Sequence, residues 1–338
     1  MTHELKSILS VAYNWQSRGI RSVLATVVAL EGSSYRRPGV RMLISDSGEV
    51  IGAVSGGCVE KEVLRQAESV FGTGISKIMT YDGRYRLGCE GILYILIEPI
   101  EISQTLLEVI QDFFKNRKTF HSISYYIPEV SQSDVYGTVL KLDGNAYLLN
   151  STFSKIDSEQ IQTFRQEFKP IFQLYIFGAE HDAVQLCDLA SRMGWEVHII
   201  ASPDEEKTIE FFKGATTLSS PFINEVDVSG IGLNTAVILM THSLNKDVQY
   251  LMALKDTNPE YIGLLGPSRR RERLLSEFLN YFPETPYHFF ESIHGPTGLN
   301  IGAETSAEIA LSIIAEILSV TRNTEVMSLK EKSGNIHD

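Results

Sequence analysis

The chain has 338 residues, with 42 acidic and 30 basic side chains and a formal net charge of −12. Apolar residues make up 43% and charged residues 21%, which excludes a disordered chain, a collagen-like repeat and a coiled-coil rod. The acidic balance argues against a nucleic-acid partner, because phosphate backbones bind basic surfaces. At roughly 100–200 residues per domain, the length predicts two domains.

Several features predict a cytoplasmic protein. No segment is long and apolar enough to span a bilayer, and the amphipathic N-terminus has no signal-peptide cleavage pattern. The three cysteines, Cys58, Cys89 and Cys187, are too few for a disulfide framework in a chain of this size, so a reducing compartment fits them best.

Residues 1–150 predict a mixed α/β domain. The β-branched, almost continuously apolar run 21–30 indicates a buried strand. The other predicted elements are helices over 4–18, 58–71 and 103–116, and strands over 40–45, 49–54, 75–80, 92–100, 121–127, 135–140 and 145–150. Residues 151–170 are predicted to be a linker, whose polar part, 151–168, contains a short helix.

Residues 171–320 predict a Rossmann-like domain with a doubly wound parallel sheet, because strands alternate with helices there. The predicted strands are 171–177, 196–201, 235–240 and 260–265, and the predicted helices are 181–193, 204–213 and 245–256. A last helix, 305–319, opens with a capping box formed by Thr305 and Glu308. This helix is apolar on nearly all sides, which predicts burial, including burial against a second copy in a homodimer. A polar tail, 321–338, follows.

The first segment that could carry chemistry is 32–42, GSSYRRPGVRM, at the end of a predicted buried strand. Its glycines permit a tight turn, its serines supply hydroxyl donors, and its arginines present planar forks that suit phosphate or carboxylate oxygens. The segment therefore reads either as an anion cradle or as a solvated turn with surface arginines. The candidate contacts are Ser33, Ser34, Arg36, Arg37 and Arg41.

The second segment comprises Ser55, Gly56, Gly57 and Cys58, between a predicted strand and a predicted helix. A helix N-terminus lowers the pKa of a cysteine placed there and favours the thiolate. The alternative is a small buried hydrophobe, the commoner fate of a lone cysteine. A P-loop is excluded because Cys58 and Val59 stand where Lys and Ser or Thr are required, and a serine-hydrolase elbow at Ser55 would need a full triad.

The third segment, 84–91, again combines arginines with a cysteine, Cys89, that is flanked by glycines. Together with Cys58 it could form a redox or metal site. The chain has no CxxC spacing here and no nearby pair of histidines, so support for a metal is weak.

In the second half, Gly178 and Glu180 occupy the place of a dinucleotide fingerprint, after the strand 171–177. Glu180 replaces the central glycine, where the backbone must approach a pyrophosphate, and this argues against bound NAD(P). Arg269 and Arg270 enter the first turn of a helix after Pro267, which indicates either a nearby anion or simple exposure.

Taken in order, these segments resemble the XdhC/CoxI family, the accessory factors for xanthine dehydrogenase and related molybdenum hydroxylases. The runs GSSYRRPGVRM, SGGCVE and LGCEG resemble its amino-terminal domain. The runs YIFGAEHDA, MTHSLNKD, YIGLLGPSRR and GPTGLNIGAETSAEIALSIIAEIL resemble its carboxy-terminal Rossmann-like domain.

The resemblance implies a cytoplasmic factor that binds molybdenum cofactor, supports its sulfuration and hands it to an apo-hydroxylase, with a cysteine desulfurase as a further partner. It implies a cofactor chaperone and assigns no catalytic residue. The implied cofactor contacts are Ser33, Ser34, Arg36, Arg37, Arg41, Ser55, Gly56, Gly57, Cys58, Cys89, Gly178, Arg269 and Arg270. Of these, the thiolates of Cys58 and Cys89 are soft ligands that could approach the molybdenum.

Two other functional classes stay open from the residues alone. The first is an NAD(P)-dependent oxidoreductase that uses the second domain, and Glu180 is the residue that argues against it. The second is a cysteine-based redox or metal-binding protein, which would carry metal and a thiol of low pKa.

Overall fold

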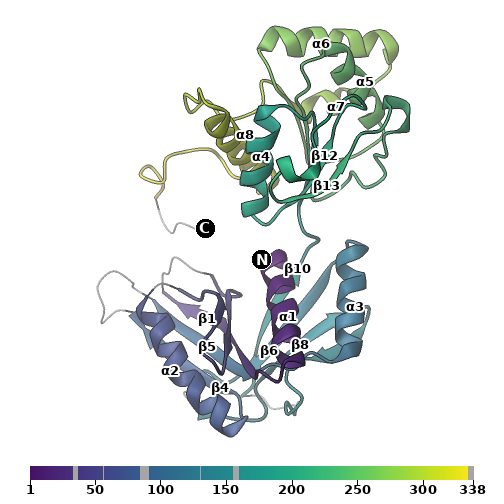
Figure 1. The fold of residues 1–338 in the computed structure, drawn as a ribbon. Helices are drawn as coiled ribbons and strands as arrows, with labels where there is room; N and C mark the ends of the chain where they lie inside the picture. The colour runs from purple at the N-terminus through teal and green to yellow at the C-terminus, as the bar shows by residue number, and fades with distance from the viewer. Residues whose placement is uncertain (33–36, 56, 84–90, 130, 155–159, 334–338) are drawn as a thin grey trace. The chain divides into compact units, whose positions relative to one another are not determined.

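A computed structural model describes residues 1–32, 37–55, 57–83, 91–129, 131–154 and 160–333 of the chain. The chain forms two compact units (Figure 1). Unit 1 comprises Met1–Pro170 with the C-terminal residues from Leu329 onward, and unit 2 comprises Ile171–Ser328.

Unit 1 contains two antiparallel sheets. Sheet A has the strand order β3-β2-β1-β5-β4-β7, and sheet B has the order β10-β6-β8-β9. The elements are α1 (Thr2–Ser17), β1 (Ser22–Glu31), β2 (Arg41–Ser45), β3 (Val50–Gly52), α2 (Cys58–Thr73), β4 (Lys77–Asp82), β5 (Ile92–Pro99), α3 (Gln104–Lys115), β6 (Phe120–Tyr126), β7 (Ser131–Gln132), β8 (Gly137–Leu142), β9 (Asn145–Leu148) and β10 (Gln162–Phe168).

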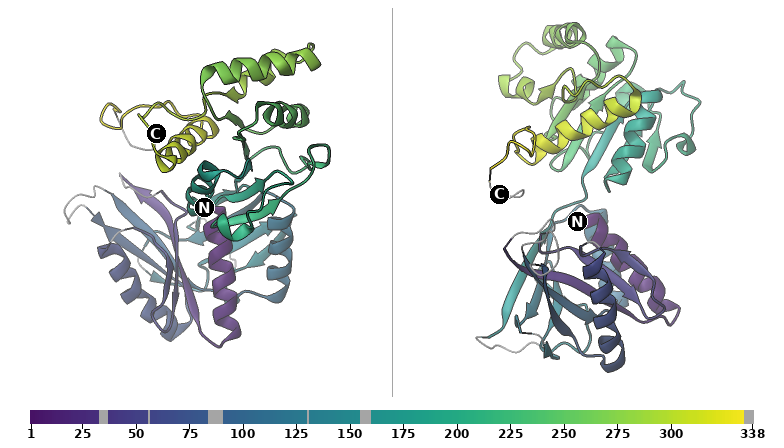
Figure 2. Two further views of the ribbon diagram at one scale, coloured as in Figure 1. Left: turned by 45° about the horizontal axis from the view of Figure 1, so that its top comes forward. Right: turned by 90° about the vertical axis from the view of Figure 1, so that its left-hand side faces the viewer.

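The layers of unit 1 follow from where its apolar side chains lie. Helix α2 buries Val59, Val63 and Val70 against sheet A, and it lies along the outside of that sheet in each view (Figures 1 and 2). A second cluster joins α1 and α3 to sheet B and to the other face of sheet A. The two sheets therefore enclose an interior between them, and polar side chains in that interior must find partners there.

Unit 2 is built on one parallel sheet, sheet C, with the strand order β13-β12-β11-β14-β15-β16. Helices α4 and α8 pack on one face of it, and α5, α6 and α7 pack on the other. Its elements are β11 (Gln173–Phe177), α4 (His181–Arg192), β12 (Glu196–Ile200), η2 (Ile209–Phe211), β13 (Ala215–Ser219), η3 (Ile223–Glu225), β14 (Thr235–Leu239), α5 (Leu244–Leu254), β15 (Tyr261–Leu264), α6 (Ser268–Tyr281), α7 (Tyr287–Glu291), β16 (Ile293–His294) and α8 (Ser306–Thr321).

This order is the doubly wound Rossmann arrangement, so the predicted fold class is confirmed. The capping box of the last helix is also confirmed, because the Thr305 hydroxyl accepts from the Glu308 N–H and the Glu308 carboxylate accepts in return. That helix is not buried on nearly all sides within the chain. It packs Ile313 and Ile317 against the domain, but Leu311 is 51% exposed.

Two predicted elements are wrong. Residues 162–168 form strand β10 and not part of a linker, because alternate side chains, Gln166 and Phe168, turn inward while their neighbours face solvent. The predicted helix over 204–213 is reduced to the short turn η2. A stable helix must bury an apolar stripe, and of this stretch only Phe212 is buried.

Candidate functional site

Three glycine-rich loops of unit 1 leave the same end of sheet A. Glu31 at the end of β1 pairs with Ile92 at the start of β5, which pairs in turn with Asp82 at the end of β4. Strand β2 begins and β3 ends toward this same end. Because antiparallel neighbours alternate in direction, the first and third motif-bearing loops start and finish there, and the second, which leads into α2, starts there. The loops are 32–40, 53–57 and 83–91.

Cys58 is the first residue of α2, and its side chain is exposed. The preceding Gly57 has a φ of +53°, and a Cβ at that position would have no neighbour within 4 Å. The first N–H groups of a helix lack intrahelical acceptors and carry partial positive charge. The structure thus places an exposed thiol in the first turn of a helix and excludes the alternative that Cys58 is a buried hydrophobe.

Six further predicted contacts belong to these three segments. Ser55 is half-buried just before α2. The others in this group lie outside the described residues: Ser33, Ser34, Arg36, Gly56 and Cys89. Joint action of Cys58 and Cys89 on a metal therefore stays a prediction.

The two described arginines of the first motif, Arg37 in the loop and Arg41 at the start of β2, have different environments. Arg37 is exposed, as an anion-binding residue must be. Arg41 is only 8% exposed, and its guanidinium donates hydrogen bonds to Gln166 and Ser122 in the interior of unit 1. The prediction that Arg41 contacts the cofactor directly therefore needs correction, because its fork is turned away from the surface and is occupied by strands of sheet B.

Arg41 shares this interior with a second ionisable group, Glu98. The Glu98 carboxylate accepts from the N–H and the hydroxyl of Thr138, at 2.8 and 2.5 Å, yet burial raises the pKa of Glu98 to about 7. Burial also lowers the pKa of Arg41 to about 10, which leaves Arg41 charged at neutral pH. Sequence reasoning missed Glu98 and Gln166. Glu98 is one charged residue in an otherwise apolar strand, and Gln166 lies in a polar stretch that was predicted to be a linker.

In unit 2, the residues of the degraded fingerprint lie where a dinucleotide would bind, at the carboxyl end of β11. Gly178 has a φ of +134°, and a Cβ there would lie 2.9 Å from the Met240 carbonyl oxygen, so the first glycine is needed for close packing of two strand ends. Glu180 is the N-cap of α4 and is half-buried. An acidic residue whose side chain makes no capping hydrogen bond is thus the N-cap of the helix whose N-terminus would receive a pyrophosphate.

The next strand end also lacks the usual acid. Ser202 follows β12, and its hydroxyl accepts from the Lys246 ammonium at 2.5 Å. Lys246 also lies 3.7 Å from the exposed Asp204 carboxylate. A ribose-binding acid is expected at the end of this strand, and a serine held by a lysine occupies its place.

The two predicted arginines of α6 separate in the structure. Arg269 is exposed. Arg270 donates to the Asp247 carboxylate at 2.7 Å and to the Thr241 carbonyl at 2.9 Å. The Asp247 side chain is 2% exposed, and burial raises its pKa. Arg270 thus neutralises a buried acid of its own unit, and its contact with a cofactor stays a prediction.

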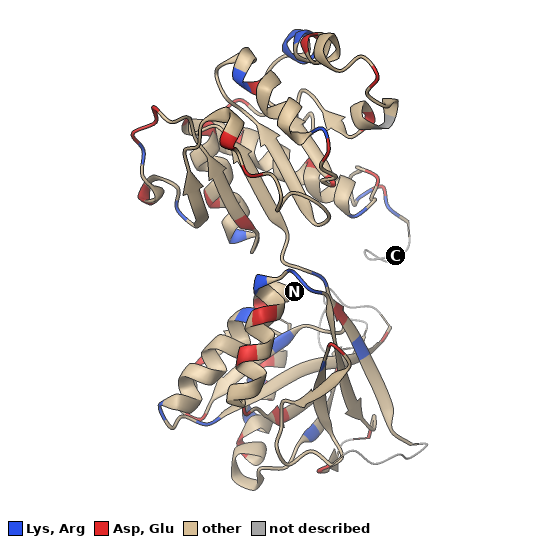
Figure 3. Ribbon diagram, turned by 90° about the vertical axis from the view of Figure 1, so that its right-hand side faces the viewer, with Lys and Arg blue, Asp and Glu red and all other residues tan. Residues whose placement is uncertain are grey.

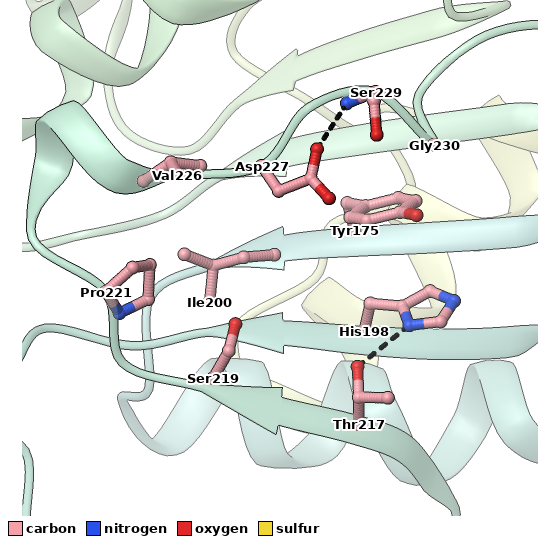
Figure 4. Close-up of a pocket in the computed structure, with 10 residues that line it drawn as sticks. All are labelled: Tyr175, His198, Ile200, Thr217, Ser219, Pro221, Val226, Asp227, Ser229 and Gly230. Carbon is pink, nitrogen blue, oxygen red and sulfur yellow. Dashed lines mark hydrogen bonds between the residues drawn. The ribbon is translucent and has the colours of Figure 1, made fainter.

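A pocket of about 280 Å³ lies on sheet C (Figure 4). Tyr175, His198 and Thr217 occupy matching positions of β11, β12 and β13, and the Tyr175 and His198 rings stack 4.6 Å apart. The segment 221–230 covers them and places Asp227 in the pocket wall. The residues that line the pocket include this aspartate and no lysine or arginine, so it does not suit a phosphate.

Sequence reasoning also missed this pocket. The available signal was the polar ring at the third position of each strand, Tyr175 in QLYIF and His198 in EVHII, where the fold otherwise places apolar residues. The connection from β13 to β14, which contains the short turn η3, contributes Pro221, Val226, Asp227, Ser229 and Gly230 to the lining.

The described part of the chain holds neither a metal cluster nor a membrane span. No three His, Cys, Asp or Glu side chains converge there as a metal site would require. No helix among these residues has both the length and the apolar character needed to cross a bilayer. Acidic and basic positions occur on both units (Figure 3).

Comparison with known proteins identifies both halves of the chain. Residues 15–82 match the XdhC and CoxI family, and residues 174–317 match the XdhC Rossmann domain. A crystal structure of a xanthine dehydrogenase from Bacillus halodurans superposes with a TM-score of 0.77 at 25% identity, covering 94% of this chain and 96% of that one.

Two relatives align over almost their whole length. A probable xanthine dehydrogenase subunit of Bacillus subtilis (strain 168) is 30% identical over 333 residues, which cover 90% of this chain and 95% of the relative. The molybdenum cofactor insertion chaperone PaoD of Escherichia coli (strain K12) is 25% identical over 332 residues, which cover 96% and 91%. With both domains matched and relatives of this similarity, the chain belongs to the XdhC/CoxI family.

Proposed function

We propose that this protein binds molybdenum cofactor and delivers it to the apo-form of a xanthine dehydrogenase-type hydroxylase in the cytoplasm. The observation that carries the proposal is the alignment, over 96% of this chain, with a relative named a molybdenum cofactor insertion chaperone. The name of the Bacillus subtilis relative, a probable component of a xanthine dehydrogenase, supports this class of client. A cysteine desulfurase, as the source of sulfur, and a second copy of the chain complete the proposed partners.

The described residues of sheet A suit this cargo, which carries a phosphate and a dithiolene-bound metal. The guanidinium of Arg37 and the first N–H groups of α2 would bind phosphate oxygens. The exposed thiol of Cys58 is a soft ligand and would hold the molybdenum end as a thiolate. The strand register supports one site for both, because the loops that carry them leave the same end of the sheet.

The alternative, an NAD(P)-dependent oxidoreductase, depends on unit 2. There Glu180 adds negative charge at the helix N-terminus, and Ser202 stands where the ribose-binding acid belongs. We therefore expect no saturable binding when the protein is titrated with NADH and followed by fluorescence. Saturation at micromolar NADH would favour the oxidoreductase.

The direct test is to purify the full chain from a host grown with molybdate and to measure bound pterin by fluorescence after oxidation. We expect pterin with the native chain and a large loss in the Cys58→Ala and Arg37→Met variants. Arg65→Met is the matched control, because Arg65 is an exposed arginine on α2 whose side chain bonds to Glu62 of the same helix.

The outcomes separate the function from the site. Absence of pterin from the native chain, under conditions in which a molybdenum hydroxylase is matured, would refute the proposed function. Pterin retained equally by native chain, Cys58→Ala and Arg37→Met would keep the function and move the site elsewhere.

A further inference from the structure

Gly39 is an anchor of the segment that leads into β2, next to Val40, whose carbonyl accepts from the Val27 N–H at 3.1 Å. The Gly39 N–H donates to the Val27 carbonyl at 2.8 Å, and its own carbonyl accepts from Arg41 Nη1 at 2.7 Å. Gly39 is buried with a φ of +100°, and a Cβ there would lie 2.7 Å from the Gln166 side-chain nitrogen. Gly39 therefore rests directly on the Gln166 amide, in a backbone conformation that favours glycine.

The Arg41 guanidinium links this anchor to the second sheet. Nη1 also donates to Gln166 Oε1 at 2.5 Å, Nη2 donates to the Ser122 hydroxyl at 3.2 Å, and the guanidinium carbon lies 5.2 Å from the centre of the Phe168 ring. Gln166 and Phe168 come from β10 and Ser122 from β6, so one side chain of sheet A is held by two strands of sheet B. The rigid planar guanidinium can donate hydrogen bonds in these directions at the same time, which the ammonium group of a lysine cannot.

The anchor lies close to the exposed arginine of the candidate site. Only Pro38 stands between Gly39 and Arg37, and the ring of a proline fixes φ near −65°. Few backbone rotations therefore separate the Arg41–Gln166 pair from Arg37. A loop that binds an anion must hold its donors in place before the anion arrives, since ordering them on binding reduces affinity.

We propose that Arg41, together with Gln166, is a positioning residue that fixes segment 37–40 from inside unit 1, and so prepares Arg37 for the cargo. The role of Arg37 rests on the proposed function. The anchoring of Gly39 does not, and it can be measured without any ligand.

Two hydrogen bonds of the same guanidinium provide a matched pair of variants. Gln166→Leu removes the acceptor and the amide on which Gly39 rests, while it keeps an interior side chain of similar size. Ser122→Ala removes the bond made by Nη2, whereas the bond to the Gly39 carbonyl is made by Nη1. If the two bonds only stabilised unit 1, the two variants would have equal effects on segment 37–40. If Gln166 positions that segment, Gln166→Leu should affect it selectively.

The measurement is amide hydrogen exchange of the full chain, read at Gly39 and Val27 and normalised to Ala25 in the middle of β1. We expect Gln166→Leu to speed exchange at Gly39 and Val27 by about tenfold, the effect of losing one buried hydrogen bond, and Ser122→Ala to change it less than about twofold. Equal effects of the two variants, or an unchanged rate at Gly39 in Gln166→Leu, would overturn the proposal.

Bound pterin supplies the second measurement. Gln166→Leu should retain several-fold less pterin than Ser122→Ala, and equal retention would overturn the link from the anchor to the cargo. If the native chain carries no pterin, the proposed function fails, and the exchange rates still decide whether Gly39 is positioned in this way.

Discussion

The ion pair between Arg270 and Asp247 allows a quantitative test of how unit 2 uses its arginines. Asp247 is a carboxylate with 2% exposure, and Arg270, with 23% exposure, is the cation that contacts it at 2.7 Å. Removing one partner of a buried pair costs about 3–5 kcal/mol, because the other charge stays buried without compensation. Since Arg270 reaches the surface, we expect Arg270→Met to lose about 3 kcal/mol of unfolding free energy, the lower end of that range.

The chain carries a convenient probe for this measurement. It has two tryptophans, Trp15 in α1 and Trp195 in unit 2. In a Trp15→Phe background, Trp195 fluorescence during urea unfolding reports on unit 2 alone. Arg273→Met is the control, because Arg273 is an exposed arginine of the same helix, and it should change the unfolding free energy by less than about 0.5 kcal/mol.

Removing Arg270 should also change how the stability of unit 2 depends on pH, through Asp247. Burial already raises the pKa of Asp247, and without Arg270 it should rise further. The folded variant would then take up a proton more readily than the unfolded chain, so the loss caused by Arg270→Met should shrink as the pH falls. Adding Asp247→Asn should restore much of the stability. A loss no larger than that of Arg273→Met, or no recovery in the double variant, would refute the assignment of Arg270 to Asp247.

Three further predictions concern single residues. Burial raises the pKa of Glu98 to about 7, above its ordinary 4.5, so between these values the folded chain holds a proton that the unfolded chain releases. The unfolding free energy of unit 1 should therefore fall as the pH rises from about 4.5 to about 7, by at most about 1.4 kcal/mol per pH unit. Glu98→Gln should flatten this slope in urea titrations followed by Trp15 fluorescence, and an unchanged slope would contradict the assignment. Cys58 is exposed, whereas burial raises the pKa of Cys187 to about 12, so alkylation mapped by mass spectrometry should label Cys58 in the folded chain and Cys187 only after unfolding. Equal labelling rates would show that Cys187 is accessible. Gly178→Ala forces a Cβ against the Met240 carbonyl at a positive φ and should cost about 1–3 kcal/mol in the Trp195 assay, while an unaltered midpoint would mean that the strand ends can separate.

The family and the second domain were readable from the sequence. The order of apolar strands and amphipathic helices predicted the doubly wound sheet, because each such strand is buried on both faces and so shows a continuous apolar run. Glu180 likewise identifies a degraded fingerprint from the sequence alone, and the structure places this residue at the N-cap of α4. A local sequence pattern is sufficient for such a prediction, because the fingerprint needs one residue type, glycine, at one backbone position.

The arrangement of unit 1 required the tertiary structure. Strand β10 has a polar sequence, and only its pairing with β6 shows that Gln166 faces inward. From sequence, Arg37 and Arg41 were equivalent donors of one motif. The structure separates them, because strand register directs the Arg41 guanidinium between two sheets and leaves Arg37 at the surface. Composition and spacing determine which groups a chain carries, whereas the pairing of distant strands decides which of those groups solvent, or a ligand, can reach.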